Sequence, residues 1–129
     1  MLESLIYPQT VAVLGASRNP AKVGHAVVAN LVASGFAGNI VPVNPEAAEV
    51  LGRKCYRNLK EYEGQVDLGV IVVPPKFVKE AIQSCIDAGA KVVTVITAGF
   101  KEVGADGAAL EQELVELCQS QDVRLMGPN

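Results

Sequence analysis

The sequence predicts an α/β fold, a Rossmann-like open parallel sheet with helices on both faces. Short segments rich in valine and isoleucine recur along the chain, and they are continuously apolar, as parallel strands covered on both faces are. Between them the apolar residues repeat every three or four positions, which is the spacing of an amphipathic helix. Strands and helices that alternate in this way build a parallel sheet with crossover connections.

Five apolar segments are the predicted strands. The third is followed by Pro74 and Pro75, which end a strand because proline has no N–H to donate to the ladder. The predicted strands cover residues 11–14, 40–43, 68–73, 92–96 and 123–126.

Three segments between the strands are predicted helices, each with one apolar face. Gly35 and Gly89 stand where the first two helices should end. The less regular segment after the second strand predicts an edge piece over 51–56 and a short helix over 58–62, with Asn58 as its cap. The apolar faces consist of Val23, Val27 and Leu31, then Val78, Ile82, Cys85 and Ile86, and then Leu110, Leu114, Leu117 and Cys118.

The chain has 129 residues, which is the size of one domain that can bury a hydrophobic core without disulfides or metal ions to stabilise it. Its longest apolar runs, such as residues 70–73, fall far short of the roughly 20 residues that span a bilayer, so we expect no membrane association. The N-terminal segment MLESLIYPQT does not resemble a signal peptide, and we therefore expect a cytoplasmic protein. Because the chain stops just after the fifth predicted strand, we expect residues 1–129 to be the N-terminal domain of a longer protein.

The charged residues, the cysteines and the histidine disfavour several classes of function. The net charge is −3 and the basic residues are scattered, so we expect no binding of nucleic acid. The three cysteines lack CxxC spacing and are expected as reduced core thiols rather than as a disulfide frame or a zinc site. His25 is the only histidine of the chain, and we expect no Ser/His/Asp triad, which would need a second histidine. The HExxH spacing of a zinc site is absent as well.

Four loops should meet at the carboxyl edge of the sheet, where open α/β folds bind their ligands. Their sequences are GASRNPAKVG, VNPE, VPPK and TAGFKEVG. The first loop leads into a helix, whose free N–H groups and positive dipole end favour a phosphate. Ser17 adds a hydroxyl to this loop, and Arg18 and Lys22 add positive charge.

The first loop departs from the usual NAD fingerprint, G-x-G-x-x-G followed by an acidic residue after the second strand. Here the stretch reads GASRNP, and Asn44 stands in place of the acid. Without the second glycine the backbone approaches a pyrophosphate less closely, and without the acid the ribose hydroxyls lose their acceptor. Both departures disfavour NAD(P), although Glu46 could replace the acid. A Walker loop is absent as well.

Taken together, these motifs resemble the CoA-binding domain of the ADP-forming acyl-CoA synthetases, the family of the succinyl-CoA synthetase alpha subunit. The same domain is fused to an acetyltransferase in bacterial protein-lysine acetyltransferases, and related forms stand alone. The resemblance covers almost the whole chain, in the order of the family. It is carried by the segments VAVLGASRNPAKVGHAVVANL, IVPVNPE, VDLGVIVVPPKFV, VITAGFKEVGADGAALEQELVELC and VRLMGPN.

The resemblance implies which residues bind coenzyme A or acyl-CoA. Those around the phosphates are Gly15, Ala16, Ser17, Arg18, Lys22, Val23 and Gly24. Those along the nucleotide, the pantetheine and the thiol end are Asn44, Pro45, Val73, Pro74, Pro75, Phe77, Thr97, Ala98 and Gly99. The family often has a lysine after VNP, and this chain has Glu46, so we expect a weaker or differently arranged site for the 3'-phosphate.

The resemblance also implies partners and leaves alternatives open. The histidine that carries phosphate in the family lies beyond this domain, so His25 is expected to pack or to border the ligand, and the domain alone is not expected to be catalytic. The expected partners are other domains or subunits of an acyl-CoA synthetase or an acetyltransferase, and a homodimer of the isolated domain would use the surface that they cover. The alternative is a stand-alone module that binds CoA or senses NAD(P).

Overall fold

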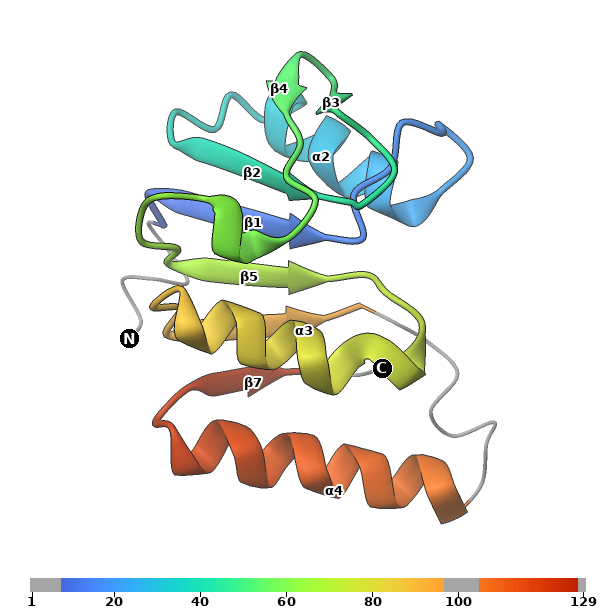
Figure 1. Ribbon diagram of the computed structural model, residues 1–129, viewed down its shortest axis with the longest axis vertical. Helices are drawn as coiled ribbons and strands as arrows, with labels where there is room; N and C mark the ends of the chain where they lie inside the picture. Colours follow the sequence, from blue (N-terminus) through green and yellow to red (C-terminus); the bar gives the residue numbers. More distant parts are fainter. Residues whose placement is uncertain (1–7, 97–104, 128–129) are drawn as a thin grey trace.

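A computed structural model of the chain describes residues 8–96 and 105–127 and confirms the α/β class. The sheet has five parallel strands in the order β2-β1-β5-β6-β7, so that their carboxyl ends lie at one edge, on the right in Figure 1. The strands are β1 (Thr10–Leu14), β2 (Asn39–Val43), β5 (Leu68–Ile71), β6 (Val92–Val95) and β7 (Arg124–Met126).

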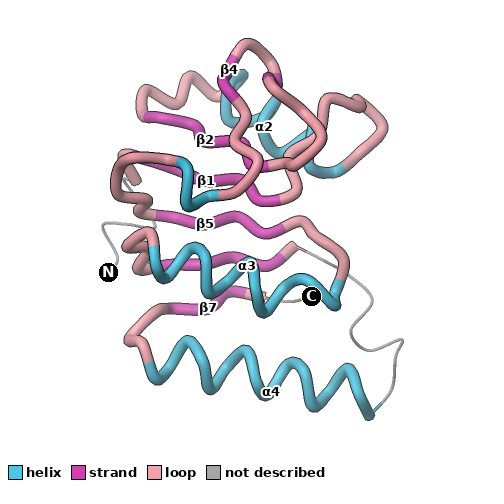
Figure 2. The backbone as a smooth tube through the Cα atoms, viewed as in Figure 1, coloured by secondary structure: helices cyan, strands magenta, loops and turns pink. Residues whose placement is uncertain are grey.

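The helices cover both faces of the sheet, as predicted. One face packs on α2 (Val23–Ala33) through side chains that include Val11, Val13 and Val28. The other face packs on α3 (Pro75–Asp87), α4 (Ala105–Ser120) and the short 3-10 helix η1 (Leu59–Glu61). Figure 2 shows the connections that leave β1 and β5 at the same edge of the sheet.

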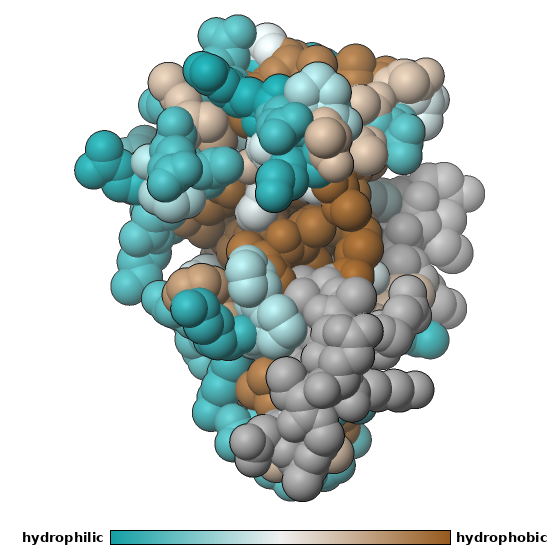
Figure 3. All heavy atoms as spheres, turned by 90° about the vertical axis from the view of Figure 1, so that its right-hand side faces the viewer, coloured by the Kyte–Doolittle hydropathy of each residue, from teal (hydrophilic) through white to brown (hydrophobic). Residues whose placement is uncertain are grey.

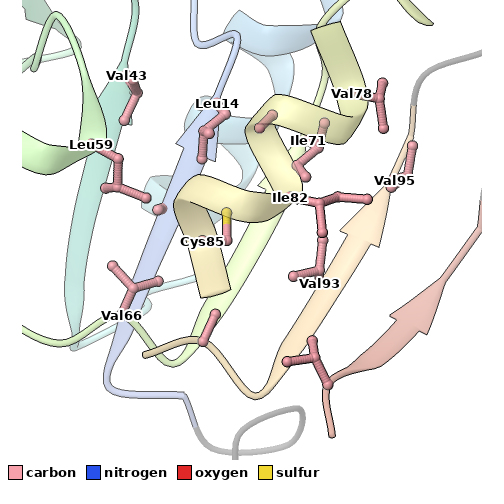
Figure 4. Close-up of a cluster of buried hydrophobic side chains, with 14 of the residues drawn as sticks. Leu14, Val43, Leu59, Val66, Ile71, Val78, Ile82, Cys85, Val93 and Val95 are labelled. Atoms are coloured by element: carbon pink, nitrogen blue, oxygen red, sulfur yellow. The ribbon is translucent and has the colours of Figure 1, made fainter. Parts of the chain in front are cut away.

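The larger core cluster lies between α3 and the sheet. Figure 4 shows Val78, Ile82 and Cys85 of α3 directed at sheet residues such as Ile71. A Cβ on Gly69 of β5 would overlap the Cys85 sulfur, so glycine at this position lets α3 approach the sheet. All three cysteines are buried and free, as expected for core thiols.

The segment between β2 and β5 folds into two small elements. Its first part is a hairpin of β3 (Glu49–Val50) and β4 (Arg53–Lys54), which forms a separate two-stranded sheet. Tyr56 then returns to the main sheet through a parallel bridge with Val43. The predicted cap is confirmed, because the Asn58 side chain accepts a hydrogen bond from the N–H of Lys60 at the start of η1.

Each strand differs slightly from its predicted range at one end. The strands β1 and β2 begin one residue earlier, at Thr10 and Asn39, and β6 ends at Val95 rather than at residue 96. The strand predicted over 68–73 ends at Ile71, because Val72 and Val73 leave the sheet and lead into α3. The last strand begins at Arg124 rather than at residue 123. Among the described residues no helix is long and apolar enough to cross a membrane.

Candidate functional site

The carboxyl edge of the sheet carries a hollowed apolar strip. Figure 3 looks onto this edge, where the brown apolar surface lies in the middle of the face, below the hydrophilic residues of the upper part. The order of the strands reverses here, since β2 lies on one side of β1 and β5 on the other. Such a switch point is where open α/β sheets bind ligands.

The loop after β1 makes a turn that only glycine permits. Gly15 has a φ of +97°, and a Cβ on it would lie 2.5 Å from the carbonyl oxygen of Val72. Its N–H donates to the carbonyl oxygen of Val43 at 3.0 Å. A Cβ on Gly24 would overlap the carbonyl oxygen of Gly15, so this second glycine lets the start of α2 lie against the turn.

Polar side chains within the loop fix its backbone. The Ser17 hydroxyl accepts from the N–H of Asn19 at 3.0 Å, and the Asn19 side chain accepts from the N–H of Ala21 at 3.0 Å. The Nδ1 atom of His25 lies 3.0 Å from the carbonyl oxygen of Ser17. Because a carbonyl oxygen only accepts, this contact requires the proton on Nδ1. His25 therefore supports the loop, in keeping with the packing role expected of it.

Asn44 joins the loop after β2 to the loop after β1. Its side-chain N–H donates to the carbonyl oxygen of Ala16 at 2.7 Å, and its side-chain oxygen accepts from the N–H of Glu46 at 2.8 Å. Its own N–H donates to the carbonyl oxygen of Tyr56 at 2.9 Å. The side chain at the position of the NAD-type acid is thus an amide that holds two loops together.

The start of α2 is suited to an anion. Lys22 precedes the helix in an extended conformation and makes no side-chain cap, and the first turn contains no acidic residue. The N–H groups of His25 and Ala26 donate to the carbonyl oxygen of Lys22, so those of Val23 and Gly24, with the positive dipole end of the helix, are left to an external acceptor. A hollow of about 370 Å³ lies beside this loop, and we call it the phosphate hollow. It is lined by Ser17, Arg18, Asn19, Asn44, Glu46 and Ala47.

A second hollow, the η1–α3 groove, lies on the other side of the strand ends. Its volume is about 330 Å³, and Leu14, Val43 and Val73 contribute to its apolar part. Phe77 lines it from α3 and is 46% exposed. Pro74 and Pro75 stand at the start of α3, where Pro75 is the first helical residue and suits a helix start.

The structure brings most of the predicted site residues to this edge. Residues 15–18 and 22–24 form the loop and the start of α2, Ala16 is buried beneath the loop, and Val23 is 55% exposed. Pro45 is exposed next to Asn44. Thr97, Ala98 and Gly99 lie outside the described residues.

Several lining residues were not predicted from the sequence. They are Asn19 and Ala47 in the phosphate hollow, and Arg57, Lys60 and Glu80 in the η1–α3 groove. The Asn58 cap predicts where η1 lies along the chain, but only the tertiary structure brings η1 to the strand ends.

Comparison with known proteins identifies the family. Residues 9–129 match the family model described as "CoA binding domain". The chain is 44% identical to "Acetate--CoA ligase [ADP-forming] I subunit alpha" of Pyrococcus furiosus, an alignment that covers 99% of this chain and 29% of the relative. It is 33% identical to "4-hydroxybutyrate--CoA ligase [ADP-forming]" of Nitrosopumilus maritimus, over 97% of this chain and 18% of the relative. The chain thus spans less than a third of the length of these relatives.

Solved structures agree with the sequence comparison. The chain superposes on a dinucleotide forming acetyl-coenzyme A synthetase 1 of Ca. Korarchaeum cryptofilum, in complex with phosphate and ADP, with a TM-score of 0.92 and 44% identity, and covers 27% of that chain. It also superposes on a conserved hypothetical protein of Pyrococcus furiosus with a TM-score of 0.73 and 30% identity, and covers 95% of that chain. With the family model matching almost its whole length, the chain belongs to the family of CoA binding domains.

Proposed function

We propose that this chain binds coenzyme A or acyl-CoA as the nucleotide-binding domain of an ADP-forming acyl-CoA ligase. The observation that carries the proposal is the uncapped start of α2, packed against the Gly15 turn and the phosphate hollow. The relatives that are ADP-forming ligases support the choice of ligase.

Different residues of the site bind different parts of CoA. The helix start and the Ser17 hydroxyl bind the diphosphate, and Arg18 and Lys22 balance part of its charge. The apolar part of the η1–α3 groove receives the adenine, since a flat aromatic ring gains from burial against aliphatic side chains. Asn44 holds the two loops at the separation that this arrangement needs.

The domain is not catalytic alone in this proposal. Among the described residues no group of histidine, cysteine or acidic side chains has the arrangement of a metal site. His25, the only histidine of the chain, is engaged with the loop backbone. The proposal assigns the phosphoryl and acyl transfer steps to other domains or subunits of the ligase, since this chain spans less than a third of the length of the relatives that are ligases. A cytoplasmic location and a homodimer stay predictions.

Calorimetric titration of the purified chain with CoA, acetyl-CoA and NAD tests the proposal. We expect CoA and acetyl-CoA to bind with similar affinity, because they differ only at the thiol end, far from the charged groups. NAD is expected to bind much more weakly or not at all. Binding of NAD in preference to CoA, or no binding of either CoA compound, would contradict the proposal.

A further inference from the structure

Two basic side chains at the rim of the η1–α3 groove have no assigned role. Arg57 precedes η1 and Lys60 belongs to it, and both are exposed and line the groove. Within residues 8–96 and 105–127 neither side chain has an ion-pair partner, since the one salt bridge there joins Lys79 to Glu113. They are thus two available cations beside an apolar pocket at the strand ends.

The groove is adjacent to the phosphate hollow. Leu14 and Val43 line the groove, and the residues that follow them, Gly15 and Asn44, form the turn and the wall of the hollow. A ligand whose diphosphate lies at the start of α2 therefore crosses the ends of β1 and β2 to reach the groove. In CoA the ribose that follows the diphosphate carries both the adenine and the 3'-phosphate, so both groups arrive together.

The charges around the hollows favour the groove rim for the 3'-phosphate. The phosphate hollow contains one cation, Arg18, which the diphosphate already uses, and the carboxylate of Glu46, which repels a second phosphate. A third hollow contains Arg57 as well, but there it is accompanied by Glu46 and Glu61. In the groove Arg57 and Lys60 come from the η1 side and the acidic residues Glu80 and Asp87 come from α3. Lys60 also lines a further hollow, which it shares with Asp87.

We propose that Arg57 and Lys60 bind the 3'-phosphate of CoA and so allow the domain to distinguish CoA from dephospho-CoA. The assignment rests on the proposed function, since it requires CoA in the site. A guanidinium presents paired N–H donors to phosphate oxygens, and the lysine ammonium adds a second positive charge.

The test is calorimetric titration of the chain with CoA and with dephospho-CoA, in the wild type and in the double variant Arg57→Gln/Lys60→Gln. We expect the wild type to bind CoA at least about tenfold more tightly than dephospho-CoA, as charge-assisted hydrogen bonds allow. In the double variant the two ligands should bind alike. Its affinity for dephospho-CoA should stay at the wild-type value, which shows that the variant is folded.

A matched control removes the same charges at the opposite edge of the sheet. Lys91 and Arg124 are exposed residues at the amino ends of β6 and β7, so Lys91→Gln/Arg124→Gln should keep the wild-type preference for CoA. Equal preference for CoA in the wild type and the Arg57/Lys60 variant overturns the assignment, and so does a wild type that does not distinguish the two ligands. Both of these outcomes leave CoA binding intact, whereas failure of the proposed function means that the wild type binds neither ligand.

Discussion

Among the single residues of the site, short polar side chains hold the binding loops in place. Ser17, Asn19 and Asn44 each accept a backbone N–H two residues further along the chain, and Asn44 also reaches across to Ala16. These side chains replace bonds that a helix or strand would supply, which is why short polar residues suit such turns. The loop after β1 is therefore shaped before any ligand binds, which reduces the entropy that binding must overcome.

Ser17→Asp tests the position of the diphosphate at this scale. The new carboxylate can still accept the N–H of Asn19, but its charge would repel a phosphate in the hollow. We expect CoA to bind at least roughly tenfold more weakly, because the Coulomb repulsion between a carboxylate and a phosphate in contact is large enough to cause such a change. Calorimetric titration with CoA measures the change.

Ser17→Asn is the neutral control for that variant. Its side-chain oxygen also accepts the backbone N–H, so the loop keeps its shape without an added charge. We expect it to bind CoA within a few-fold of the wild-type affinity. If Ser17→Asp binds as tightly as the wild type, Ser17 lies outside the phosphate site.

The contact between the Gly15 turn and α2 is the feature of the site that matters most at the level of elements. The helix begins where the turn ends, and Gly24 brings their backbones together. The N–H groups of α2 can face a ligand at the sheet edge only because of this close approach. The position of one helix relative to one strand thus determines whether an anion site exists.

Gly24→Ala tests this contact. The added methyl group would overlap the carbonyl oxygen of Gly15, so α2 must move away from the turn. We expect the melting temperature to fall by roughly 5 °C or more, because overpacking of a close contact destabilises the fold. We also expect CoA to bind much more weakly. Thermal unfolding and titration with CoA give the two readouts.

Gly35→Ala separates loss of stability from loss of the site. Gly35 has a φ of +76° at the end of α2, and a Cβ there meets nothing within 4 Å. The strained backbone should lower the melting temperature, while the helix start and the affinity for CoA stay as they are. A Gly24→Ala variant that loses stability and still binds CoA like the wild type would show that the close approach does not build the site.

The elements themselves were largely predictable, because buried parallel strands and amphipathic helices leave distinct apolar patterns. The strand predicted over 68–73 was two residues too long, since Val72 and Val73 are as apolar as a strand, although Val72 packs on the α2 side of the sheet and Val73 lines the groove. The hairpin of β3 and β4 has strands of two residues, too short for a periodic pattern. The proximity of Gly24 to Gly15, and of η1 to the strand ends, depends on tertiary packing, which no local pattern encodes.

For the whole molecule, the strand order determines where the site forms. Because the chain moves from β1 outward to β2 and then back across β1 to β5, α2 lies on one face and α3 and α4 on the other. The loops on the two faces separate above β1, with the phosphate hollow beside the loop that leads to α2 and the η1–α3 groove on the side of α3. The binding site therefore depends on a stable packing of α3 against the sheet.

The buried Cys85 couples that packing to pH. Its side chain is 0% exposed between α3 and β5, and burial, followed by the neighbouring Cys118, raises the pKa of its thiol from 9.0 to about 12. Between these values the folded chain keeps the proton that the unfolded chain loses. The folded state then binds more protons, so the free energy of unfolding falls as the pH rises through this range. The slope for one such group is up to about 1.4 kcal/mol per pH unit.

Urea unfolding at several values from about pH 8 to about pH 11 measures this slope, with Cys85→Ala as the test variant. The variant should be less stable near neutral pH, because it leaves a cavity, and its stability should fall less steeply than that of the wild type above pH 9, because one titrating thiol is gone. Val93→Ala makes a comparable cavity in the same cluster without removing a thiol, and it should keep the wild-type slope. Lysine and tyrosine side chains titrate in all three proteins, so their effect cancels in the comparison. Equal slopes in the wild type and Cys85→Ala would mean that the thiol reaches water and ionises without unfolding, and that α3 opens from the sheet more readily than its buried side chains indicate.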